Sequence, residues 1–220
     1  MKHQLTLKQL PARCVLLCLG LAVMALGVAF SIKASLGTSP ISSFPYVTSR
    51  ISGLSVGTTT IIVNTFFVLI QIPILRNRYQ WFQLLQFPAV IVFGLLIDAG
   101  GALIQGITFA DYFQQWLLCV IGILLVGLGV SLEVAAGLVT TAGEGVVLAI
   151  CQVFPVKFST VKIAFDVTLV CISILTSFLF LGGLEGIREG TVAAAVCVGL
   201  VTRQCQKPVK WVTKKLLPAG

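Results

Sequence analysis

Long apolar runs alternate with short polar segments along the chain, and this pattern predicts a helical membrane protein. A membrane-spanning helix needs roughly 20 predominantly apolar residues, and most of the runs are close to that length. We expect six spans, at 13–34, 57–75, 82–104, 113–136, 158–181 and 190–203. The segments between them are too short to hold a separate soluble domain. The predicted fold is therefore all-α and polytopic.

Two stretches, 37–56 and 137–155, are rich in glycine and hydroxyl residues and too polar for ordinary lipid-facing spans. Irregular backbone at membrane depth is tolerated only where it is buried in protein or lines a cavity. We therefore expect a broken, re-entrant segment at each stretch, with a central site between them. Surface loops between ordinary spans are the alternative.

The two halves of the sequence match when the first is shifted by 102 positions. The register holds without a gap from Gly20 to Ile70, and matched polar or glycine positions are the most informative. These include Gly27 with Gly129, Thr38 with Thr140, Thr58 with Thr160 and Asn64 with Asp166. The match predicts an internal duplication. The expected parts are a basic head (1–12), repeat 1 (13–104), a connecting loop (105–112), repeat 2 (113–203) and a basic tail (204–220).

Composition and charge agree with a membrane location and suggest a topology. Apolar residues make up 57% of the chain and charged residues 10%, against about 45–50% and 25% in soluble domains. The net charge of +8 comes largely from the ends, which places both termini in the cytoplasm. If 37–56 enters the membrane and returns to the same side, Arg76 and Arg78 are also cytoplasmic, and each half of the chain crosses the membrane three times. The halves are then inverted, whereas eight full spans would make them parallel.

Several classes of function do not fit the sequence. Basic residues at the ends of a membrane protein suit anionic lipid, so we expect no nucleic-acid partner. The seven cysteines form no CxxC pattern and His3 is the only histidine, which argues against a metal site. With no Ser-His-Asp set and no phosphate loop, we expect neither an enzyme nor a cofactor.

Charged residues within the spans are the first candidates for chemistry, because each costs about 2.5–3.5 kcal/mol at the centre of a span on insertion scales. Lys162 and Asp166 lie four apart on one helix face and can pair, and Glu133 and Glu144 flank the second break. These groups fit a proton relay or a cation site, or else a structural ion pair. For Asp98, near the end of its span, we favour a structural role.

Hydroxyls near the breaks suit polar or anionic ligand groups at helix N-termini, although helix capping and close packing explain many of them. The candidate substrate-binding residues are Thr38, Ser39, Thr60, Asn64, Thr140, Thr141 and Asp166. The candidates for ion or proton coupling are Glu133, Glu144 and Lys162.

Three segments carry a family resemblance: KASLGTSPISSFPYVTS at 33–49, G-x-S-x-G-x-x-T at 53–60 with Asn64 after it, and REGTVAAAVCVG at 188–199. The chain resembles the bacterial YczE/YyaS/YitT-type membrane proteins, which are known for an LGTSP-type segment after the first span. The resemblance implies a bacterial inner-membrane location and transport, but no site residues. The second half has LVTTA at 138–142 instead, so we expect two chemically unequal halves of the site.

Two functions follow as hypotheses. The first is a small-molecule secondary transporter with its site at the repeat interface and proton coupling as an option. The second is an accessory or scaffold protein that binds a partner or lipid, and a homodimer is left open. A pocket at mid-membrane lined by 37–45 and 137–145 would favour the first, and a sealed polar centre the second.

Overall fold

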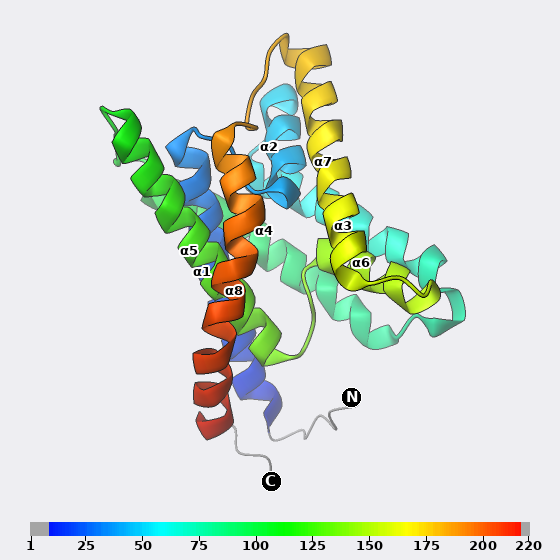
Figure 1. Ribbon diagram of the computed structural model, residues 1–220. Coiled ribbons are helices and arrows are strands. Elements are labelled where there is room, and N and C mark those ends of the chain that lie inside the picture. The colour runs from blue at the N-terminus through cyan, green and yellow to red at the C-terminus, as the bar shows by residue number, and fades with distance from the viewer. Residues whose placement is uncertain (1–8, 217–220) are drawn as a thin grey trace.

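The computed structural model describes residues 9–216, which fold into α-helices joined by short loops, with no strand in that range (Figure 1). The predicted all-α class is confirmed. Residues 1–8 and 217–220, parts of the predicted head and tail, lie outside the described residues. Within the described range the helices are α1 (Leu10–Ala34), α2 (Pro40–Ser52), α3 (Val56–Leu75), α4 (Gln86–Leu103), α5 (Tyr112–Ala136), α6 (Ala142–Val153), α7 (Phe158–Leu181) and α8 (Glu189–Leu216), with the short 3₁₀ helices η2 (Arg76–Arg78) and η3 (Trp81–Leu85) between α3 and α4.

Five helical segments in the described part of the chain are long and apolar enough to cross a membrane: Leu10–Ala34, Val56–Arg78, Trp81–Leu103, Tyr112–Ala136 and Phe158–Leu181. They correspond to five of the six predicted spans. The sixth prediction, 190–203, falls on the first half of α8. That helix continues to residue 216 through a basic stretch that includes Arg203 and Lys207.

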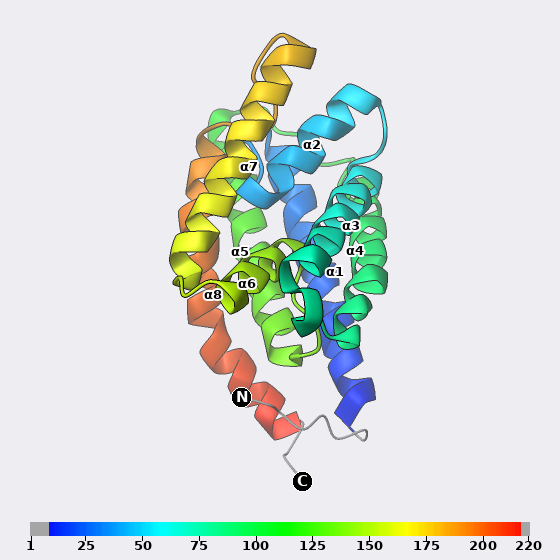
Figure 2. The same ribbon diagram turned by 90° about the vertical axis from the view of Figure 1, so that its right-hand side faces the viewer.

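The two predicted breaks each consist of a short non-helical segment followed by a short helix, α2 or α6. The helix before each break ends in a left-handed residue, Ser35 after α1 and Gly137 after α5. The first break continues through Gly37, whose φ of 98° favours glycine. Pro40 then opens α2, where its missing N–H costs no helical hydrogen bond. Both short helices begin near the middle of the molecule (Figure 2).

Corresponding helices in the two halves begin 102 positions apart. This holds for α1 and α5 (residues 10 and 112), α2 and α6 (40 and 142), and α3 and α7 (56 and 158). The left-handed residues that end α1 and α5 keep the same spacing. The displacement is the one that the sequence comparison predicts.

Helices α1 and α5 run in opposite directions and cross with their backbones in close contact (Figure 1). A Cβ atom added to Gly20 would lie 3.0 Å from the carbonyl oxygen of Gly129, and one added to Gly27 would lie 2.8 Å from that of Gly122. Small residues allow this approach, which is common between helices in membranes. The contacts are reciprocal, because Gly20 and Gly122 are matched positions, as are Gly27 and Gly129.

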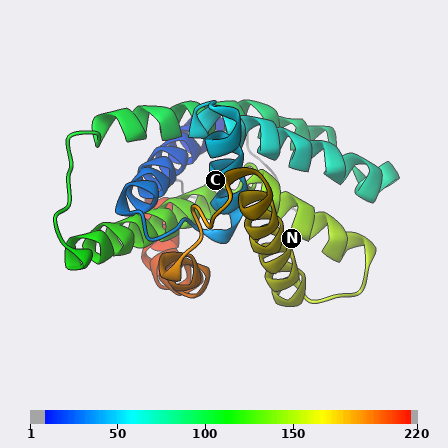
Figure 3. The ribbon, with the colours of Figure 1, turned by 90° about the horizontal axis from the view of Figure 1, so that it is seen from above.

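Two further pairs of helices join the halves in the same way, since α3 packs against α6 and α2 packs against α7. In the first contact Gln71 lies against Gly145, and in the second the hydroxyls of Ser43 and Ser173 are 3.1 Å apart. One difference breaks the pattern. Helices α3 and α4 pack closely through Gly57, whereas α7 and α8 stand apart (Figure 3).

Candidate functional site

A cavity of 410 Å³ lies between the first turns of α2 and α6. Its volume is in the range of ligand pockets, roughly 300–1,000 Å³. All eight α-helices of the described chain contribute to its wall, and most lining side chains are apolar. The polar and charged lining residues are Ser39, Ser42, Thr60, Asn64, Gln86, Glu133, Thr140, Thr141, Glu144, Lys162, Asp166, Thr202, Arg203 and Gln206.

Nine of the ten candidate residues from the sequence line this cavity. They are Ser39, Thr60, Asn64, Glu133, Thr140, Thr141, Glu144, Lys162 and Asp166. The structure does not bring Thr38 to it. The Thr38 backbone N–H donates to the Gly186 carbonyl at 3.0 Å, and its buried side chain lines a separate, smaller cavity beside Tyr46 and Arg188.

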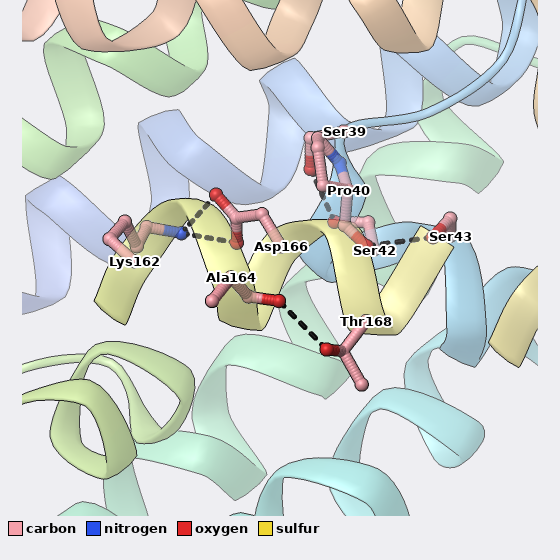
Figure 4. Close-up of polar contacts among 8 residues, drawn as sticks. All are labelled: Ser39, Pro40, Ser42, Ser43, Lys162, Ala164, Asp166 and Thr168. Atoms are coloured by element: carbon pink, nitrogen blue, oxygen red, sulfur yellow. Dashed lines mark hydrogen bonds and ion pairs between the residues drawn. The ribbon is translucent and has the colours of Figure 1, made fainter. Parts of the chain in front are cut away.

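The wall formed by α7 carries an ion pair. The Lys162 ammonium lies 2.6 and 2.8 Å from the two carboxylate oxygens of Asp166 (Figure 4). Both side chains are mostly buried, with 27% and 22% of their surfaces exposed. The pair that the four-residue spacing allows is therefore present, and it neutralises both charges.

Two further carboxylates, Glu133 and Glu144, lie where α5 leads into α6. Glu133 is 2% exposed; the backbone N–H of Thr141 donates to its carboxylate, and Oε2 has no hydrogen-bond partner. Glu144 stands in the first turn of α6, close enough to Lys162 and Asp166 to interact electrostatically with both. Within residues 9–216 neither glutamate forms an ion pair. The positive end of the α6 dipole favours acidic groups here.

The opposite wall, from α2 and α3, is polar but uncharged. The Ser39 hydroxyl donates to the Ser42 hydroxyl at 3.0 Å (Figure 4). Thr60 donates to the Val56 carbonyl at 2.7 Å, and the Asn64 amide donates to the Thr60 carbonyl at 3.0 Å. These groups therefore have local backbone or hydroxyl partners within α2 and α3.

The charged and uncharged walls correspond position by position under the 102-residue shift. Ser42 matches Glu144, Thr60 matches Lys162 and Asn64 matches Asp166, and all six line the cavity. The charged member always lies in the second half. The two sides of the cavity are thus chemically unequal, as the sequence predicts.

Two glutamines that sequence reasoning missed complete the polar centre. Gln71 is fully buried, and its amide donates to the side-chain oxygen of Gln86 at 3.1 Å and to the Ala142 carbonyl at 3.2 Å. It thereby ties α3 to the first residue of α6, and Gln86 lines the cavity. Side-chain amides are neither charged nor hydroxyl groups, so the criteria of charge and hydroxyl content do not include them. An amide inside an apolar run is itself a signal, because it must find partners in hydrocarbon.

Asp98 lies outside the cavity and has a structural environment. Its carboxylate accepts from the Ser55 hydroxyl at 2.6 Å and from the Gly57 N–H at 2.7 Å. It therefore binds an N–H of the first turn of α3 that has no partner within the helix, and it joins α3 to α4. This position supports the structural role favoured from the sequence.

Comparisons with known proteins place the chain in a family. It is 26% identical to an uncharacterized protein of Haemophilus influenzae over 86% of this chain and 80% of that protein. It is 26% identical to the uncharacterized membrane protein YczE of Bacillus subtilis over 84% of this chain and 80% of YczE. The Bacillus subtilis protein YyaS, also uncharacterized, is 25% identical over 82% of this chain and 85% of YyaS.

No solved structure matches the chain. The resemblance drawn from the LGTSP segment is confirmed by these relatives and by a family model, described as a family of unknown function (DUF6198), that matches residues 11–207. The chain therefore belongs to the DUF6198 family of unknown function.

Proposed function

We propose that this protein is a small-molecule secondary transporter whose substrate site is the cavity between α2 and α6. The observation that carries the proposal is that both broken segments meet at this cavity, with hydroxyls on one side and charges on the other. Short helices that begin at mid-membrane form the binding sites of many secondary transporters. An accessory protein would instead be expected to have a sealed, fully paired polar centre.

The proposed architecture is a pair of inverted repeats, α1–α4 and α5–α8. The constant displacement of the helices and the reciprocal contacts of α1 with α5 support it. In this arrangement α8 makes the sixth crossing, and its basic end lies in the cytoplasm together with the N-terminus. Rocking one repeat against the other would expose the cavity alternately to the two sides of a bacterial inner membrane.

We further propose that transport is coupled to protons through the carboxylates of the cavity. The charged groups on its wall are Glu133 from α5, Glu144 from α6, Lys162 and Asp166 from α7, and Arg203 from α8. Helices α1 to α4 contribute none. A carboxylate in a membrane must be paired, hydrated or protonated. Substrate binding and proton binding therefore compete for, or share, the same groups.

Flux into proteoliposomes tests the proposal. A thermal-shift screen of small metabolites on the purified protein first identifies a ligand, because a compound that binds the native state raises its apparent stability. Uptake of that ligand is then measured with and without an imposed pH gradient. We expect uptake above that of protein-free liposomes, and faster uptake with the gradient. Uptake no faster than in protein-free liposomes would contradict transport.

Two variants test the coupling against a matched control. Asp166→Asn and Glu144→Gln each remove one carboxylate from the cavity, whereas Asp111→Asn removes an exposed one at the start of α5. We expect the first two to reduce gradient-driven uptake and the third to leave it unchanged. If both cavity variants keep wild-type flux and its pH dependence, the carboxylates do not couple transport to protons.

A further inference from the structure

The balance of charges on the cavity wall, together with the gap between α7 and α8, indicates the class of substrate. We infer that the cavity accepts an amphipathic organic cation, with its charged group against Glu133 and Glu144 and its apolar part against the aliphatic and aromatic side chains of α1, α4, α5 and α8. This inference rests on the proposed function and narrows it to one chemical class.

The charged groups of the cavity wall favour a cation. Of the groups on the cavity wall, Lys162 and Asp166 neutralise each other. Arg203 also lines the cavity, but it is exposed on the basic part of α8. The two remaining charged groups, Glu133 and Glu144, are both acidic.

Of these two acids, Glu133 gives the stronger evidence for a cationic ligand. It is almost fully buried, its Oε2 atom has no hydrogen-bond partner, and Thr141 at the start of α6 donates to its carboxylate. A carboxylate without a partner of opposite charge is costly in a low-dielectric site unless a cation or a proton joins it. A cationic ligand would complete this site, whereas an anion would meet two carboxylates.

The rest of the cavity wall is apolar. Helices α1, α4, α5 and α8 surround this part of the cavity with aliphatic and aromatic side chains. They include Leu17, Leu21, Met24, Val90, Phe93, Val126, Val130, Ala195 and Val198. A small hydrated cation would gain nothing from these side chains. An organic cation with an apolar body would bury its surface against them.

The gap between α7 and α8 offers a route into the cavity from the bilayer. Helices α3 and α4 close one side of the molecule, but α7 and α8, which both line the cavity, stand apart (Figures 1 and 3). Two residues of α7, Phe158 and Ile163, line the cavity and are also 42% and 64% exposed. The cavity wall therefore continues into the apolar outer surface. An amphipathic molecule can enter from the bilayer with its apolar part towards the lipid.

Equilibrium binding of two matched ions tests the inference. Tetraphenylphosphonium and tetraphenylborate have similar size and shape but opposite charge. Each is titrated separately into the full-length protein in neutral detergent by calorimetry, with protein-free micelles as the blank. We expect saturable binding of the cation and none of the anion. Anion binding equal to or stronger than cation binding would overturn the inference.

Variants then locate the charge and the apolar contact. Glu133→Gln and Glu144→Gln should each weaken tetraphenylphosphonium binding by about tenfold or more, since each removes a charge partner from a poorly solvated site. The control Asp111→Asn should bind as the wild type does. Tetramethylammonium, which lacks the apolar body, should bind much more weakly. Gel filtration checks that both glutamine variants are folded. If both then bind tetraphenylphosphonium with wild-type affinity, the proposed site is refuted. If tetramethylammonium binds as tightly as tetraphenylphosphonium, the apolar contact is refuted.

The outcomes separate this inference from the proposed function. Binding of tetraphenylphosphonium without any flux would leave the cation site standing and contradict transport. Flux of an anionic ligand that the tetraphenylphosphonium ion does not displace would support transport and overturn the cation class.

Discussion

Replacing Gly129 by alanine tests the crossing of α1 and α5, which is the most extensive contact between helices in the described part of the chain. A Cβ atom at this position would lie 2.6 Å from both the Cβ and the backbone nitrogen of Met24 and 2.7 Å from the carbonyl oxygen of Gly20. Two of these three atoms belong to the α1 backbone. They cannot swing aside as a flexible side chain would, so the helices must separate.

The expected cost follows from two opposing effects. Overpacking a well-packed interface costs about 1–3 kcal/mol, while alanine gains up to about 1 kcal/mol over glycine in a helix interior. Because two of the close atoms belong to the backbone, the overpacking cost should lie in the upper half of its range, and we expect Gly129→Ala to lower the free energy of unfolding by about 1–2 kcal/mol. Gly20→Ala should cost less, because its nearest neighbours lie at 3.0 Å. Gly101→Ala is the matched control, because nothing lies within 4 Å of its added Cβ, and it should be neutral or stabilising.

Thermal denaturation of the three variants in one detergent measures this order. The fraction that remains monodisperse on gel filtration after heating gives a midpoint for each protein. The expected order of midpoints is Gly101→Ala highest, Gly20→Ala lower and Gly129→Ala lowest. If Gly129→Ala is as stable as the control, the backbones of α1 and α5 are not in contact there.

Three further predictions concern single contacts and topology. Asp98→Asn should lower stability by about 1–2 kcal/mol, because it weakens the cap on α3; a thermal midpoint equal to that of the wild type would contradict this role. Lys162→Met should destabilise the protein more than the double variant Lys162→Met with Asp166→Leu, because the single change leaves a carboxylate unpaired; a double-mutant cycle with no coupling would argue against the ion pair. Single cysteines introduced at Gln80 and Gly183 of a cysteine-free chain should react with an impermeant thiol reagent from the cytoplasmic and the external side respectively, and labelling from the same side would rule out the proposed topology.

The sequence predicts the positions of the spans and breaks well, because both depend on local composition. An apolar run must be buried in lipid, and a run interrupted by glycine, proline and hydroxyls must be buried in protein. The constant shift of 102 residues is a property of the sequence itself, and the helices keep it. Charges such as Asp166 also stand out in an apolar run, which explains why most candidate residues line the cavity.

Thr38 shows where this reasoning fails. It stands next to Ser39 in the first break, and composition treats the two alike. The backbone at Ser39 is extended, with φ −60° and ψ 153°, and consecutive side chains of an extended segment point to opposite sides. Ser39 therefore faces the cavity while Thr38 faces the loop before α8. The direction of a side chain depends on dihedral angles that a motif does not specify.

The end of α8 differs from the end of the span that the sequence predicts. The predicted span ends at residue 203, where the apolar run meets basic residues, yet the helix continues to residue 216. Lysine, arginine and glutamine are good helix formers, so a change from apolar to charged residues ends a hydrophobic surface and not a helix. The sequence predicts the depth of burial here and not the end of the secondary structure.

The unequal walls of the cavity would give the inward-facing and outward-facing states of a transporter different free energies. Two identical inverted repeats would give an inward-facing and an outward-facing state that are equivalent and equally populated. In the proposed pair of inverted repeats, the charged residues lie on the second repeat and their uncharged counterparts on the first, so exchanging the roles of the repeats would change the surroundings of every charge. This removes the degeneracy, and a difference of about 1.4 kcal/mol between the two states already gives a tenfold bias in population. A transporter built in this way would rest on one side of the membrane, and the charges that bind its substrate would also select that side.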